Sequence, residues 1–218
     1  MGFKPEGAKS GQIDRLYRVD VVKSSIGKEF IRKHHYSHGC HNGPMTWGLY
    51  KKQRLIGVIA FATPCSENVR RSIFGPAKVD SVTELHRLVI LDGTPTNTES
   101  WFISRALKLL KERKPGIQAV ISFADATEGH SGIIYMATNA FFTGTTGRAT
   151  FYKDEGGRLR HPRQNGVNIS LSEAENRHWV PVKRDAKNRY VYILGNGPAE
   201  TRRLKKEMLL EPLPYPDH

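Results

Sequence analysis

Apolar and polar residues alternate with a period of two along much of the chain. Such alternation, between stretches rich in glycine, proline and other turn residues, is typical of strands that bury one face. The pattern predicts strands over residues 15–22, 47–50, 55–62, 82–91, 117–123, 148–153 and 189–194.

Other stretches place apolar residues at helical spacing. The clearest begins at Thr96 and runs to about Arg113, and Thr96 and Glu99 have the spacing of a capping box. The same reasoning predicts helices over 24–31, 130–142, 172–178 and 198–210, and a loop over 63–80. Strands and helices therefore alternate, which favours an α/β fold.

The chain has 218 residues, 38% of them hydrophobic, which is enough for one domain of ordinary size with an extension. We expect a catalytic domain over residues 1–160. We expect residues 161–218 to form a basic C-terminal extension that packs on it.

Charge indicates a polyanionic partner, with nucleic acid the leading candidate, because the formal net charge is +13. Residues 148–206 hold fourteen Lys and Arg against six Asp and Glu, with Trp179, Tyr190 and Tyr192 interleaved among them. The alternative is a basic surface that serves only solubility. The candidate DNA contacts are Arg148, Arg158, Arg160, Arg163, Lys183, Arg184, Arg189, Arg202 and Arg203.

The two cysteines, Cys40 and Cys65, form no CxxC motif. They indicate neither a disulfide framework nor a cysteine-based zinc site, and they suit a reducing compartment. No apolar run reaches signal-peptide or membrane-spanning length, so we expect no membrane association.

The densest group of polar residues lies between Ser122 and Gly144, in the segment SFADATEGHSGIIYMATNAFFTG. Asp125 follows a buried strand, where a carboxylate suits a general base or an acceptor for a substrate amine. Its alternative role is to cap the turn. Tyr135 suits a proton donor, or is simply a half-buried tyrosine on a helix.

Residues 34–41 hold four histidines and a cysteine. His34 and His38 have the spacing of ligands on one helix face, although Gly39 follows and no third ligand is evident. His35 and Tyr36 suit a pocket in which an aromatic ring stacks on an extruded base.

Two further features suit an anion. Arg87 lies within an apolar strand and needs a phosphate or a carboxylate partner, for which Glu84 and Asp125 are candidates. The helix expected after Thr96 presents unpaired N–H groups that suit a phosphate, although many helices begin this way.

Several segments together resemble the Mom family of bacteriophage DNA-modification proteins, which look like members of the GNAT N-acetyltransferase superfamily. They are HHYSHG at 34–39, ELHRLVI at 84–90, TNTESWFISRALKLL at 96–110, the block at 122–144 and RYVYILG at 189–195. The resemblance covers roughly residues 15–210.

The resemblance implies a mixed central sheet flanked by helices. It also implies an enzyme that converts the N6 amine of adenine in double-stranded DNA to a methylcarbamoyl (carbamoylmethyl) form in the host cytoplasm, which protects phage DNA from restriction. Carried over by position, His35, Tyr36, Asp125 and Tyr135 would surround the reacting centre. Arg87 and Ser100 would line the path of acetyl-CoA or a related coenzyme A donor.

The chain departs from the superfamily because the turn after the fourth expected strand has no glycine beyond Gly93. A plain acetyl transfer to N6 would form an amide, whereas the product has a methylene carbon joined to N6 and a carboxamide beyond it. The reaction therefore needs a source of nitrogen and attachment through the other carbon, which a redox metal such as iron near His35 and Asp125 would help to explain. Two alternatives are an acetyltransferase acting on a protein or small-molecule amine, and a non-catalytic DNA-binding protein. The polar block at 122–144 favours an enzyme.

Overall fold

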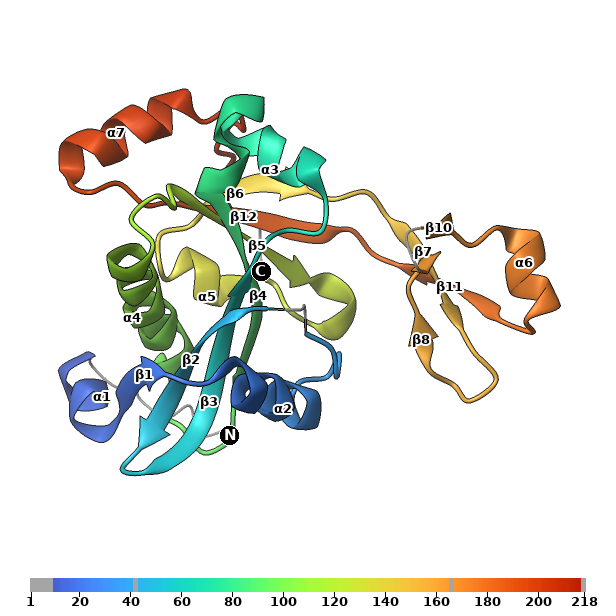
Figure 1. Ribbon diagram of the computed structural model, residues 1–218, viewed down its shortest axis with the longest axis horizontal. Coiled ribbons are helices and arrows are strands. Elements are labelled where there is room, and N and C mark those ends of the chain that lie inside the picture. The colour runs from blue at the N-terminus through green and yellow to red at the C-terminus, as the bar shows by residue number, and fades with distance from the viewer. Residues whose placement is uncertain (1–9, 41–42, 165–166, 217–218) are drawn as a thin grey trace.

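The fold is built on a seven-stranded sheet in the order β1-β2-β3-β4-β5-β12-β6 (Figure 1). This computed structural model describes residues 10–40, 43–164 and 167–216. Only β4 and β5 pair in parallel, and every other neighbouring pair is antiparallel. The strands are β1 Arg18–Val21, β2 Met45–Lys51, β3 Arg54–Ala62, β4 Val82–Ile90, β5 Ala119–Asp125, β6 Phe141–Thr145 and β12 Lys187–Ile193.

Helices cover both faces of this sheet. One apolar cluster joins α1, α4 and α5 to the face that carries Ile59, Phe61 and Tyr190. Two other clusters join α2 and α3 to the face that carries Val58 and Ile121. The helices are α1 Ser10–Leu16, α2 Ser24–His34, α3 Glu67–Phe74, α4 Thr98–Arg113, α5 Ile133–Met136 and α7 Pro198–Glu207, with 3-10 turns at Pro76–Ser81 and Ala126–Glu128.

The two parallel strands separate part-way along their length. β4 and β5 pair from Val82 to Leu85 in one strand and from Ala119 to Ser122 in the other. The pairing of β3 with β4 skips His86, which lies in an irregularity between Leu85 and Arg87. The carboxyl-terminal halves of β4 and β5 are therefore not paired with each other and diverge beyond Leu85 and Ser122.

A second, smaller unit is inserted between β6 and β12, and we call residues 149–184 the small lobe. It projects from the main body (Figure 1). Tyr152, Ile169 and Ala174 form its own apolar cluster. It consists of β7 Ala149–Lys153, β8 Leu159–Arg160, β9 Arg163–Gln164, β10 Val167–Asn168, α6 Leu171–Asn176 and β11 Val180–Arg184.

The expected mixed sheet flanked by helices is confirmed, but the expected boundary at residue 160 does not separate two units. It falls inside the small lobe, and β12 beyond it lies in the main sheet between β5 and β6. The apolar residues of β12 are buried on both faces, so this strand is part of the core.

Three local expectations were wrong. Residues 63–80, which were expected to form a loop, contain α3 and a 3-10 turn. Val69 and Ile73 give α3 an apolar face that packs on the core. The strand expected over residues 15–22 is limited to Arg18–Val21, because residues 10–16 form a helix before it. The long helix expected after His130 is limited to Ile133–Met136, because Asn139 takes a left-handed φ of 62° and β6 follows.

The cap of α4 also differs from the expectation. Asn97, not Thr96, is the N-cap residue, and its φ is 72°. No side chain caps the helix there, whereas Thr98 donates its hydroxyl hydrogen bond to the carbonyl of Pro95. None of the helices in the described ranges is long and apolar enough to cross a membrane.

Candidate active site and protein family

Asp125 lies at the end of β5, where the strand has diverged from β4, and only 4% of it is exposed. One carboxylate oxygen accepts a hydrogen bond from the backbone N–H of Thr127 at 3.2 Å. The other accepts from Arg184 at 2.8 Å and lies 3.0 Å from the ammonium of Lys187. Burial alone would raise the pKa of this carboxyl, but Lys187 and Arg184 outweigh it, and the pKa lies below its ordinary value.

Arg184 also pairs with Glu128 at 2.8 Å, so the cluster contains two carboxylates and two cations. We call Asp125, Glu128, Arg184 and Lys187 the ion cluster. It joins the end of β5 to the start of β12 and to the last residue of the small lobe. Asp125 is therefore ionised and held by cations, which makes it a weak proton acceptor and a strong anchor.

Three aromatic side chains, those of His35, Tyr36 and His130, lie together, and the backbone N–H of His130 donates to the carbonyl of Asp125 at 3.2 Å. The ring of Tyr36 lies 4.3 Å from that of His35 and 5.6 Å from that of His130. Tyr36 remains 47% exposed, so one part of its surface is available to a planar ligand. Burial, followed by the charge of Asp125, raises the pKa of the Tyr36 hydroxyl.

His35 is held in one tautomer. The backbone N–H of Ser37 donates to its Nδ1 at 3.1 Å, so Nδ1 is an acceptor and the neutral ring carries its proton on Nε2. Burial, with the charge of Arg87 next, lowers the pKa of His35 to about 4. At neutral pH this histidine is thus an uncharged N–H donor.

Tyr135 lies in α5, and its side chain is buried. Burial raises the pKa of its hydroxyl to about 12, although a hydrogen bond with Ser122 opposes this. Ser122 in turn donates to the carbonyl of Leu85 at 3.2 Å, at the last paired position of β4 and β5. The Tyr135 hydroxyl is therefore protonated and lies close to the point where the strands separate.

The loop that carries His130 is fixed by Tyr190. The hydroxyl of Tyr190 donates to the carbonyl of Ser131 at 2.9 Å, and its ring packs 5.2 Å from that of Tyr135. Gly132 has a φ of 91°, and a Cβ atom there would lie 2.4 Å from the Tyr190 ring. Glycine is needed here because it adopts a positive φ without strain and has no Cβ atom to collide with the Tyr190 ring.

The two expected coenzyme residues differ in surroundings. Arg87 donates from Nε to the carbonyl of Gly39 at 2.8 Å and from a terminal nitrogen to that of His86 at 2.6 Å. It thus joins β4 to the segment after α2, close to His35. Ser100 lies in the first turn of α4, where its hydroxyl donates to the carbonyl of Asn97 at 3.1 Å.

The candidate DNA contacts fall into two groups. Four are engaged within the chain: Arg160 with Asp154, Arg184 in the ion cluster, Arg189 with Thr143, and Arg203 with Glu200 and Glu207. Four are exposed: Arg148, Arg158, Lys183 and Arg202. The side chain of Arg163 lies outside the described residues.

The expected iron site is not supported. Among the described residues no three His, Cys, Asp or Glu side chains are grouped as metal ligands. The donors of the expected pair do not fit a cation either, because Asp125 already faces Arg184 and Lys187, and Nδ1 of His35 is used by Ser37.

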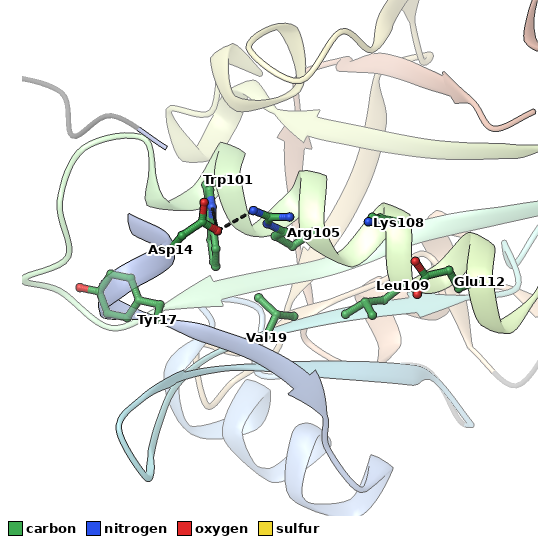
Figure 2. Close-up of a pocket in the computed structure, with 8 residues that line it drawn as sticks. All are labelled: Asp14, Tyr17, Val19, Trp101, Arg105, Lys108, Leu109 and Glu112. Carbon is green, nitrogen blue, oxygen red and sulfur yellow. Dashed lines mark hydrogen bonds and ion pairs between the residues drawn. The ribbon is translucent and has the colours of Figure 1, made fainter. Parts of the chain in front are cut away.

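A separate open pocket of about 340 Å³ lies between α1, β1 and α4 (Figure 2). Asp14 accepts there from Trp101 at 3.2 Å and from Arg105 at 2.5 Å. None of the expected site residues lines it, so we do not assign the reaction to this pocket.

The sequence predicted Asp125, His35, Tyr36 and Tyr135 as site residues, and these assignments stay predictions. It did not single out Glu128 and Lys187, which belong to the ion cluster, or His130, whose ring lies beside Tyr36. The signal for His130 was its place in the polar block. No sequence signal pairs Lys187 with Asp125, because their contact depends on the register of β12 against β5.

A family model described as the Mom protein family matches residues 16–217. This match spans nearly the whole chain. The chain belongs to the Mom protein family. It is similar to a protein of Escherichia phage Mu named methylcarbamoylase Mom, with 27% identity over 220 residues, 97% of this chain and 88% of the relative.

This Mom family member also matches solved N-acetyltransferase structures. One is a spermidine N-acetyltransferase chimera from Vibrio cholerae, with a TM-score of 0.49, 9% identity, and coverage of 87% of this chain and 98% of the other. Another is the ribosomal-protein-S18-alanine N-acetyltransferase of Escherichia coli, with a TM-score of 0.47, 7% identity, and coverage of 84% and 97%.

Proposed function

We propose that this protein is a transferase that modifies the N6 amine of adenine in DNA to a carbamoylmethyl form and so protects phage DNA from host restriction. Its membership of the Mom family over residues 16–217 carries this proposal. The similarity to methylcarbamoylase Mom of phage Mu supports the nature of the added group. The place of action would be the cytoplasm of the bacterial host.

The target adenine would bind beside Tyr36. This ring is half exposed and is bordered by His35 and His130, and an aromatic surface of this kind suits stacking with an extruded base. The Nε2–H of His35 would donate to an acceptor on the base or the donor group. Because His35 stays neutral at physiological pH, it would provide this hydrogen bond without adding a charge to the site.

Tyr135 would act as the proton donor to the leaving group. Its hydroxyl is protonated and buried where β4 and β5 separate. Asp125 would hold Arg184 and Lys187 in place, so that their charges face the reacting centre. This role replaces the general base considered from the sequence, because a carboxylate paired with two cations accepts a proton poorly.

A coenzyme A donor would lie between the diverging ends of β4 and β5. The residues present fit such a group in one respect, because no side chain caps the first turn of α4 and its N–H groups suit a phosphate. When bound, a coenzyme A thioester would supply the two carbons of the added group, and its carbonyl carbon would lose the thiolate to an ammonia-level nitrogen donor. The bond between N6 and the methyl carbon would require a separate two-electron oxidant. Ser100 in that turn and Arg87 in β4 would border the donor.

DNA would contact the exposed cations of the chain. Arg148, Arg158 and Lys183 belong to the small lobe or its edge, and Arg202 lies on α7. Binding through such residues would weaken steeply with added salt.

The test is mass spectrometry of nucleosides from plasmid DNA recovered from bacteria that express the folded protein. We expect a deoxyadenosine that carries one carbamoylmethyl group. Unmodified adenine throughout would overturn the proposal. Turnover of acetyl-CoA with a small amine, unaffected by DNA, would point instead to an acetyltransferase of another kind.

A further inference from the structure

One face of the small sheet β11-β7-β8 is exposed along its outer row and partly buried in the rows beyond it. The register places Leu159, Lys153 and Val180 in one row across the three strands. Phe151 and Val182 form the next row, and Arg184 lies beyond them opposite Ala149. We call this surface the open face.

The other side of the same sheet is packed. Tyr152, one residue along from Phe151, is buried against Ile169 and Ala174. On the open face, by contrast, Val180 is 62% and Leu159 is 44% exposed. Large apolar side chains gathered on one exposed surface indicate a binding site rather than a chance exposure.

The open face adjoins the candidate active site. The ring of Phe151 meets that of His161 edge-on, with centroids 5.0 Å apart. The guanidinium of Arg184 lies 5.8 Å from the centre of the Phe151 ring and donates to Asp125 at 2.8 Å. The side chain of Arg184 therefore lies between Phe151 and Asp125.

The charge of this region suits DNA. Residues 148–187 hold nine Lys and Arg against five Asp and Glu. Lys153 lies within the open face, and Arg158 lies in the adjoining turn. A second copy of the same basic surface would bring like charges together, whereas a polyanion would neutralise them.

We propose that the open face packs against the DNA duplex beside the target adenine, and that Phe151 fills the space from which the adenine is extruded. This inference rests on the proposed function. An enzyme that acts on a base within a duplex must remove it from the stack, and apolar side chains inserted between base steps favour that state. Phe151 is a large aromatic side chain of this face, and it borders the site that would receive the base.

The experiment uses a duplex in which 2-aminopurine replaces an adenine found to be modified in plasmid DNA. This analogue becomes brighter when it leaves the stack. The wild-type protein should raise its fluorescence, and Phe151→Ala should lose most of that increase. Fluorescence anisotropy with the same duplex should show that the affinity of Phe151→Ala falls by less than about tenfold, because phosphate contacts persist.

Leu171→Ala is the matched control, since Leu171 is 63% exposed on α6 of the same lobe. It should behave as wild type. A duplex with an abasic position opposite the 2-aminopurine should restore the fluorescence increase with Phe151→Ala, because the unpaired base costs less to extrude. The proposal would be overturned if Phe151→Ala gave the same fluorescence increase as the wild type, or if Leu171→Ala lost as much of the increase as Phe151→Ala.

A second pair of variants avoids any dependence on the folding of Phe151→Ala. Leu159→Glu adds a charge to an exposed position of the open face and should weaken duplex binding by at least about tenfold, whereas Leu171→Glu should not. If the wild type modifies plasmid adenine while Leu159→Glu binds the duplex normally, the proposal for the open face is wrong and the proposed function stands. If wild type modifies no adenine, the proposed function itself fails.

Discussion

Arg184, the last residue of β11, donates a hydrogen bond at 2.8 Å to Asp125, the last residue of β5. This contact joins the small lobe to the main sheet at the point where the reaction is proposed to occur. Only 11% of the Arg184 side chain and 5% of the Asp125 side chain are exposed, so the pair is shielded from water and salt. The position of the lobe relative to the site therefore depends on this ion pair.

Asp125→Ala should destabilise the fold by about 3 kcal/mol, because the buried Arg184 loses one of its two carboxylate partners and Lys187 loses its ion pair with Asp125. Arg184→Ala should cost a similar amount. The double variant should cost much less than the sum of the two, because both singles disrupt the same pair. Urea unfolding measures all three free energies, and additive losses would contradict the coupling.

Arg203→Ala provides the matched control for that cycle. Arg203 pairs with Glu207 on α7, but 53% of its side chain is exposed. An exposed pair of this kind contributes less than about 1 kcal/mol.

His35 should make stability depend on pH. Its pKa is lowered from 6.5 to about 4, so the unfolded state binds a proton more readily than the folded state. The resulting stability is complete above pH 6.5 and is lost as the pH falls toward 4, by up to about 3 kcal/mol. His35→Gln should flatten this part of the profile, as measured by urea unfolding at several pH values.

The tautomer of His35 can be measured independently of its effect on stability. Nitrogen-15 spectra of the imidazole at pH 7 should show a neutral ring protonated on Nε2, because Nδ1 accepts from Ser37. A ring protonated on Nδ1, or one that titrates near pH 6.5, would contradict the donor role.

Tyr135→Phe should fold and bind DNA as wild type does, because the ring that packs against Tyr190 is retained. It should reduce adenine modification by about a hundredfold or more if its hydroxyl donates the proton. Tyr192→Phe is the control, since that hydroxyl bonds Thr138 at 2.6 Å instead. Nucleoside mass spectrometry should find normal modification with Tyr192→Phe, and equal losses from both variants would contradict the assignment.

Gly132→Ala should displace the loop that carries His130. The added Cβ would meet the Tyr190 ring at 2.4 Å and would also strain a φ of 91°. Gly129→Ala adds comparable strain at a φ of 75° but no clash, because nothing lies within 4 Å. We expect a markedly lower melting temperature for Gly132→Ala than for Gly129→Ala, and similar values would argue against close packing here.

Much of the main sheet can be predicted from its alternating pattern. The hairpin of β2 and β3, the strand β4 and the helix α4 all follow from local periodicity. Residues 130–142 mislead because Ile134, Ala137 and Phe141 have helical spacing, yet β6 begins at Phe141 to pair with β12. That pairing joins residues about fifty positions apart, which no local pattern reveals.

Contacts between residues distant in sequence also limit what can be predicted of the candidate site. Asp125 stands out as a carboxylate after a buried strand. Its partners Arg184 and Lys187 looked like DNA contacts or ordinary surface charge, because only the register of β12 brings them to it. Charge counts locate a basic region, but the fold decides which cations are already neutralised.

The central claim is that this protein modifies adenine in DNA, and nucleosides from plasmid DNA test it most directly. Cells that express the wild type should yield deoxyadenosine with a carbamoylmethyl group, and cells that express Tyr135→Phe at equal levels should yield almost none. The account is contradicted if wild-type expression leaves every adenine unmodified, or if the added group lies on another base.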